Sequence, residues 1–117
     1  MESVIHFEMS AKDIEKVKNF YERVFRWQFK KPSNSNYWFI KTGNNKGING
    51  GIKKASLDNK VINIIEVRNI EETIKKIKNN NGEIIRKKAL VKNIGWLAYF
   101  KDTEKNIFGI LQRDKNK

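Results

Sequence analysis

The stretch Val4-Ile5-His6-Phe7-Glu8-Met9 decides the predicted fold, and it holds the single histidine of the chain. Its apolar residues alternate with His6 and Glu8. This period of two residues predicts a β-strand, about Ser3 to Met9, that carries His6 and Glu8 on the same face. We expect the apolar set to pack beneath a helix, so that the imidazole and the carboxylate face a cleft.

The following segment, residues 11–25, has the spacing of a helix. Its apolar residues recur at intervals of three or one, at Ile14, Val17, Phe20, Tyr21, Val24 and Phe25. This spacing predicts one amphipathic helix, with Ser10 offering the N-terminal cap and Asp13 following three residues later. Three short strands are predicted after it, at residues 27–29, 37–41 and 48–53.

After a predicted linker at residues 55–60, the same order of elements begins again. A strand is predicted at 61–67, a helix at 70–79 with Asn69 as its cap, and strands at 83–89, 96–100 and 106–113. Short sequences recur as well: D-I-E at 13–15 as N-I-E at 69–71, Trp38 as Trp96, and G-I at 51–52 as 109–110. The sequence therefore predicts an α+β fold of two βαβββ modules, about 1–54 and 60–113, within a single domain over 1–117.

Two parts of the chain resemble the vicinal oxygen chelate superfamily, which includes glyoxalases, bleomycin-resistance proteins and extradiol dioxygenases. The first part comprises residues 4–9, the D-I-E at 13–15 and N-F-Y-E-R-V-F-R-W at 19–27. The second, F-K-D-T-E-K-N-I-F-G at 100–109, is similar to the Asp-Pro-x-Gly-Asn turn of the family, with Thr103 and Lys105 replacing proline and glycine. The resemblance implies a curved, partly open mixed sheet around a cleft, with the helices on its convex side, and a homodimer.

In the enzymes of this superfamily, four strands each supply one ligand to a divalent metal. The resemblance places these four positions at His6, Ile62, Gly51 and Gly109. Isoleucine and glycine side chains have no donor atom, and a divalent metal needs several. We therefore expect a degenerate metal site and no cofactor. A metal-dependent lyase, isomerase or dioxygenase is the alternative.

The residues expected to face the cleft predict a small-molecule site. His6 and Glu8 are the candidate acid–base pair, unless they form a structural pair that is hydrogen-bonded across strands. The candidate ligand-binding residues are Asn49, Gly51, Lys53, Ile62, Gly109, Trp38 and Trp96. The two glycines either leave room for an organic ligand or permit close strand packing. Each tryptophan belongs to the ligand site, the core or the dimer interface.

The formal net charge of +12 bears on the choice of partner. Most of the basic residues are lysines scattered along the chain, so we expect a neutral or anionic small ligand rather than a nucleic acid. A basic nucleic-acid-binding module is the second alternative. The chain contains no cysteine, which excludes disulfides and thiolate metal sites. We expect no membrane span and no signal peptide, and we expect a cytoplasmic protein.

Overall fold

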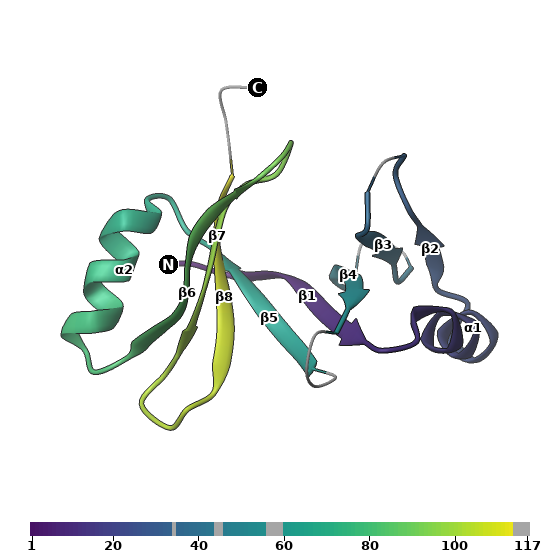
Figure 1. Cartoon of the computed structure of the whole chain (residues 1–117), viewed down its shortest axis with the longest axis horizontal. Helices are drawn as coiled ribbons and strands as arrows, with labels where there is room; N and C mark the ends of the chain where they lie inside the picture. Colours follow the sequence, from purple (N-terminus) through teal and green to yellow (C-terminus); the bar gives the residue numbers. More distant parts are fainter. Residues whose placement is uncertain (34, 44–45, 56–59, 114–117) are drawn as a thin grey trace. The chain divides into compact units, whose positions relative to one another are not determined.

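The computed structural model describes residues 1–33, 35–43, 46–55 and 60–113, so residues 56–59 of the predicted linker lie outside it. The elements follow the predicted order (Figure 1): β1 (Val4–Ala11), α1 (Ile14–Phe25), β2 (Gln28–Lys30), β3 (Trp38–Lys41), β4 (Asn49–Lys54), β5 (Lys60–Glu66), α2 (Ile70–Asn79), β6 (Glu83–Val91), β7 (Gly95–Lys101) and β8 (Ile107–Arg113). The predicted α+β class with two βαβββ modules is confirmed. Neither helix within the described residues is long and apolar enough to span a membrane.

The chain forms two compact units. The N-terminal unit is His6–Ile62, and the C-terminal unit is Asn63–Lys117 together with Met1–Ile5. The first residues belong to the C-terminal unit because the backbone N–H of Glu66 donates to the carbonyl oxygen of Ser3 at 3.0 Å. Strand β1 therefore contributes to both units.

In the N-terminal unit the strands lie in the order β2-β3-β4-β1. Strand β1 runs parallel to β4, whereas β3 is antiparallel to both β4 and β2. Helix α1 covers one face, where the buried core consists of Met9, Ala11, Ile40 and Ile52. Half-buried residues of the predicted helix stripe, including Ile14, Val17 and Tyr21, pack against this core, as the spacing requires.

The C-terminal unit repeats this arrangement in the order β5-β8-β7-β6, with β5 parallel to β8 and a core of Val67, Ile70, Ala98 and Ile110. Gly51 pairs with Glu8 in one unit, and Gly109 pairs with Ile64 in the other. The predicted correspondence of these two glycines is therefore consistent with the register of the strands.

The predicted correspondence of Trp38 with Trp96 is wrong. Trp38 pairs with Ile52, whereas Trp96 pairs with Gln112. The register that matches the two glycines places Ala98 opposite Ile110, so Ala98 is the counterpart of Trp38. The sequence spacing missed this because the connections before β3 and β7 differ in length.

The N-cap of α1 is Asp13 and not Ser10, which corrects the prediction. Strand β1 continues to Ala11, so Ser10 lies within the strand, and its hydroxyl accepts a hydrogen bond from the backbone N–H of Lys60 at 3.0 Å. The carboxylate of Asp13 accepts from the backbone N–H of Lys16 at 3.2 Å. The predicted cap of α2 is confirmed, since the Asn69 side chain accepts from the backbone N–H of Glu72.

The Asp13 cap gives a testable consequence. Replacing Asp13 with alanine leaves one N–H of the first helical turn without its acceptor, so we expect the free energy of unfolding to fall by about 1 kcal/mol. Urea denaturation measures this change. Lys16→Ala is the matched control, because it keeps the backbone N–H and changes only an exposed side chain. Equal stability of Asp13→Ala and the unsubstituted chain would contradict the assignment of the cap.

Candidate functional site

The candidate site lies on the face of the N-terminal sheet opposite α1. Met9, Ile40 and Ile52 point toward α1 and are buried in the core. Because successive side chains of a strand point to opposite faces, their neighbours point the other way. We call this opposite face the site face, and its central residues are His6, Glu8, Phe39, Gly51 and Lys53.

Four polar side chains form a continuous network on the site face. The Nε2 atom of His6 lies 2.8 Å from the hydroxyl oxygen of Tyr37. That hydroxyl is also hydrogen-bonded to the carboxylate of Glu8, and Nζ of Lys53 lies 3.2 Å from Oε1 of Glu8. The predicted neighbours His6 and Glu8 are thus joined through Tyr37.

The proton positions in this network follow from the number of donors. A phenol has a single proton, and an ionised carboxylate only accepts. Tyr37 therefore donates to Glu8 and accepts from Nε2 of His6, so Nε2 carries a proton. Burial raises the pKa of Tyr37 far above its ordinary value, and the negative charge of Glu8 and the hydrogen bond to it raise it further.

Burial distinguishes Glu8 from the other members of the network. Glu8 is 5% exposed, whereas the Lys53 side chain is 41% exposed and His6 and Tyr37 are half-buried. A buried carboxylate is costly unless it is paired and hydrogen-bonded. Lys53 and Tyr37 supply that pairing.

Gly51 is the residue over which Tyr37 lies. A Cβ atom at position 51 would stand 1.9 Å from the Tyr37 hydroxyl oxygen and about as close to the ring carbons Cζ and Cε1. The space left by the absent side chain is therefore filled by the phenol. Neither alternative drawn from the sequence, room for an organic ligand or close strand packing, describes this arrangement, in which a side chain packs over the glycine.

Of the four positions that the resemblance assigns to metal ligands, His6 alone has a side chain with a donor atom. Among the residues that the structure describes, no three His, Cys, Asp or Glu side chains lie together as a metal-binding group. The phenol of Tyr37 occupies the place from which a ligand at position 51 would reach His6. Two donors from β1, one of them already bound by Lys53, are fewer than such a metal requires.

The other predicted site residues lie in different surroundings. Asn49 pairs with His6 across β1 and β4, but its side-chain oxygen accepts hydrogen bonds from the backbone N–H and hydroxyl of Thr42. Trp38 lies on the α1 side, packed against the core. Ile62 is half-buried in the N-terminal unit.

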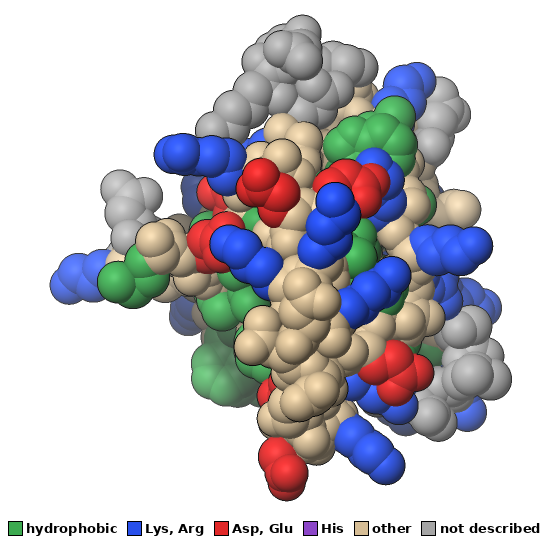
Figure 2. All heavy atoms as spheres, turned by 90° about the vertical axis from the view of Figure 1, so that its left-hand side faces the viewer, with side chains coloured by type: hydrophobic (Ala, Val, Ile, Leu, Met, Phe, Trp, Pro, Cys, Tyr) green, Lys and Arg blue, Asp and Glu red, His purple; other side chains and the backbone are tan. Residues whose placement is uncertain are grey.

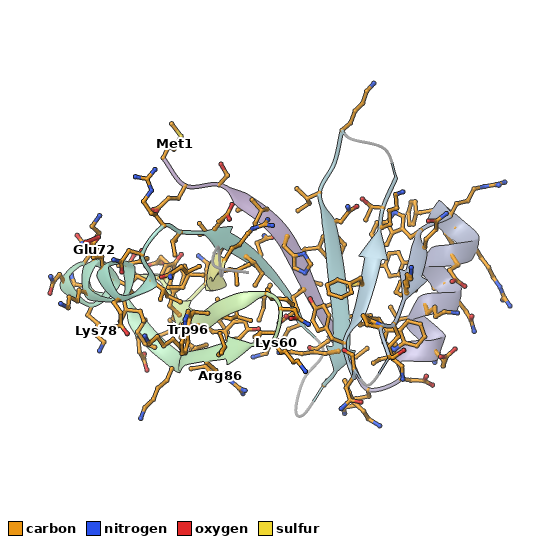
Figure 3. All side chains as sticks on the ribbon, turned by 90° about the horizontal axis from the view of Figure 1, so that it is seen from above. Met1, Lys60, Glu72, Lys78, Arg86 and Trp96 are labelled. Atoms are coloured by element: carbon orange, nitrogen blue, oxygen red, sulfur yellow. The ribbon has the colours of Figure 1, made fainter. Side chains whose placement is uncertain are left out.

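Two predicted site residues belong to the C-terminal unit. Trp96 packs against the core beside α2, with Nζ of Lys88 4.6 Å from its ring centroid (Figure 3). Gly109 is buried, and a Cβ there would stand 2.5 Å from Cδ1 of Ile64 and 3.3 Å from Tyr99. Both glycines of the repeat thus lie beneath a large neighbouring side chain.

Sequence reasoning missed Tyr37 and Phe39. Tyr37 immediately precedes β3 and makes its contact with a residue 31 positions away. Both faces of this strand carry large rings, so the sequence does not indicate which rings face the site. The pairing of Phe39 with Gly51, which places an aromatic side chain opposite a residue with none, becomes visible only in the register of the strands.

No protein-family model matches the sequence, and no curated protein matches it. Solved structures do match. A glyoxalase/bleomycin resistance protein/dioxygenase superfamily member from Vibrio splendidus 12B01 is 15% identical, covers 96% of this chain and 99% of its own, and has a TM-score of 0.67. This chain has the vicinal oxygen chelate fold.

Other proteins with this fold have different activities. Methylmalonyl-CoA epimerase from Mycobacterium tuberculosis is 4% identical with a TM-score of 0.69, and the match covers 96% of this chain and 88% of that one. The Mn(II)-bound glyoxalase from Novosphingobium aromaticivorans is 13% identical with a TM-score of 0.67, over 96% of this chain and 40% of that one. At these identities the likeness establishes the fold alone.

The contact between Tyr37 and Gly51 predicts that position 51 does not tolerate a side chain. Gly51→Ala displaces the phenol from His6, so we expect the free energy of unfolding to fall by about 1–3 kcal/mol, as in other overpacked sites. Gly47→Ala is the matched control, because a Cβ there meets only Thr42 at 4.0 Å. Equal losses in the two variants would show that Tyr37 does not lie over Gly51.

The raised pKa of Tyr37 predicts a pH dependence of stability. The folded protein holds the phenolic proton above the ordinary pKa of 10.0, where the unfolded chain releases it. This contribution to stability is therefore complete below about pH 10 and is lost as the pH rises further.

Absorbance at 295 nm measures the ionisation of the three tyrosines. We expect Tyr37 to stay protonated in the folded protein after an ordinary tyrosine has ionised, and Tyr37→Phe to remove this late step. Glu8→Gln removes the negative charge beside the phenol, so we expect it to lower the pKa of Tyr37. Burial of the phenol still keeps this pKa above its ordinary value. A single step near pH 10 for all three phenols in the folded protein would contradict the network.

Proposed function

We propose that this chain binds a small organic molecule, neutral or anionic, on the site face around His6 and Lys53, without a divalent metal. The main observation in support of this proposal is a difference between the two repeats. Glu8 and Ile64 occupy equivalent places, each paired with the glycine of the parallel strand. Ile64 is 2% exposed and apolar, so the fold itself does not need a buried carboxylate there.

The same contrast extends to His6. Its equivalent by the spacing of the two first strands is Ile62, which has no polar group. A buried polar network costs free energy unless every member is satisfied, and an apolar set is often at least as stable. A network kept in one repeat and replaced by isoleucine in the other supports a role beyond folding.

If the bound molecule is a substrate, His6 is the residue that exchanges a proton with it. Glu8 is nearly inaccessible, and the Tyr37 hydroxyl is engaged by both Glu8 and His6. The phenol joins His6 to the carboxylate and fixes which imidazole nitrogen carries the proton. This is acid–base chemistry that needs no metal.

The mixed charge on the face that carries α2 supports a small ligand over a nucleic acid there. Figure 2 shows the face that carries α2, where acidic side chains lie between the basic ones and no single basic stripe forms. Nucleic-acid-binding surfaces instead gather lysine and arginine along one groove or helix. The neighbours named as an epimerase and a glyoxalase act on small molecules, which supports the same choice. The homodimer stays a prediction that the solution mass of the purified chain will check.

Elemental analysis of purified protein, combined with a thermal-shift screen of small organic molecules, tests this function. We expect no stoichiometric Zn, Mn, Ni or Fe, and at least one molecule whose stabilisation is lost in His6→Ala. A ligand at a hundredfold excess over its Kd stabilises by about 2.7 kcal/mol, which such a screen detects. Lys87→Ala is the control, because it changes an exposed side chain on β6.

Two results would contradict the proposal. Stoichiometric metal that disappears in His6→Ala would favour the metal-dependent alternative. Molecules that stabilise the His6→Ala variant as strongly as the unsubstituted chain would place binding away from the site face.

A further inference from the structure

Three rings lie side by side on the site face. The centroids of the His6 and Tyr37 rings are 6.3 Å apart with an interplanar angle of 23°, and the Phe39 ring meets Tyr37 edge to face at 5.3 Å. Tyr37 lies over Gly51, which pairs directly with Phe39. We call these three residues the aromatic platform.

Phe39 is the exposed member of the platform. It is 40% exposed, although its neighbours on β3, Trp38 and Ile40, are packed on the α1 side. Phe39 pairs with Gly51 on one side, where Tyr37 meets its ring edge to face, and with the exposed Lys30 on the other. Its ring is thus available for stacking.

Lysines surround the platform. Lys30 pairs with Phe39, and Lys41 follows two residues after Phe39 on the same strand, so both share the site face. Lys53 lies on the same face, where it pairs with Glu8. Glu8 is the only acidic residue on the site face in the described parts of β1 to β4, and its carboxylate is already neutralised by Lys53.

We infer that the ligand class of this site is the planar aromatic carboxylate, with its ring stacked on Phe39 and its carboxylate held by Lys30 or Lys41. This inference rests on the proposed function and names its ligand class. Aromatic rings stack on aromatic side chains in offset or edge-to-face geometry. The excess of three lysines over one glutamate favours a negative group beside the ring.

The shape of the platform decides between candidate ligands. An aliphatic carboxylate can form ion pairs with the lysines but cannot stack on the aromatic rings. A neutral aromatic satisfies the rings but not the lysines. Only a molecule with both features uses Phe39 and the lysines together.

Three probe molecules separate these cases: 2-naphthoate, the neutral 2-naphthalenemethanol, and cyclohexanecarboxylate. Binding is followed by NMR through the His6 imidazole and Phe39 ring signals. We expect 2-naphthoate to shift both sets of signals and to bind tighter than either of the other probes. Equal binding of cyclohexanecarboxylate and 2-naphthoate would overturn the inference, as would no shift at either ring.

Two sets of variants test the contacts. Phe39→Ala is expected to weaken 2-naphthoate binding about fivefold or more, in line with one lost ring contact. Phe20→Ala is the matched control, because Phe20 is 54% exposed on α1 and lies outside the site face. The double variant Lys30→Gln/Lys41→Gln is expected to bring 2-naphthoate down to the affinity of the neutral probe.

The remaining outcomes separate this inference from the proposed function. If screened molecules depend on His6 but are insensitive to Phe39→Ala, the ligand class is wrong and the small-molecule site stands. If no molecule depends on His6, both fail. A single-stranded oligonucleotide that binds the platform with steep salt dependence, while 2-naphthoate does not bind, would overturn the inference in favour of a nucleic acid.

Discussion

The site depends on the two hydrogen bonds made by the hydroxyl of Tyr37. This hydroxyl accepts from His6, donates to Glu8 and lies where a side chain at position 51 would begin. Without this phenol the buried carboxylate loses a hydrogen-bond donor, and the imidazole loses the contact that fixes its proton. The glycine at position 51 makes room for this phenol, and the buried position of the phenol beside Glu8 raises its pKa.

The internal repeat shows which features belong to the fold. Both units bury isoleucines beneath a helix and place a glycine on the strand parallel to the first. The network of His6, Tyr37, Glu8 and Lys53 belongs to the first βαβββ module, whereas the second module has isoleucine at two of the equivalent positions, Ile62 and Ile64. The same backbone therefore supports either a polar or an apolar surface at this place.

Much of the architecture was predictable from local patterns. The alternation around His6, the helix stripe of α1 and the Asn69 cap are properties of neighbouring residues, so the sequence displays them. The prediction of Ser10 as the helix cap was wrong because β1 continues past Met9, and the ends of strands depend on pairing with distant segments. The sequence analysis missed Tyr37 for the same physical reason, because its partners lie far away in sequence. In addition, a strand with aromatic rings on both faces does not show in its sequence which face is buried.

The close packing of Tyr37 against Gly51 also limits how the site can be changed by substitution. A carboxylate gained at position 51 would collide with the phenol, and a phenol gained beside an existing carboxylate would meet the same obstacle. A change to an arrangement with a carboxylate at position 51 must therefore pass through an intermediate with small residues at both positions. The volumes of the two side chains therefore limit the order of substitutions. The arrangement with Tyr37 and Gly51 cannot change in a single step to one with a carboxylate at position 51.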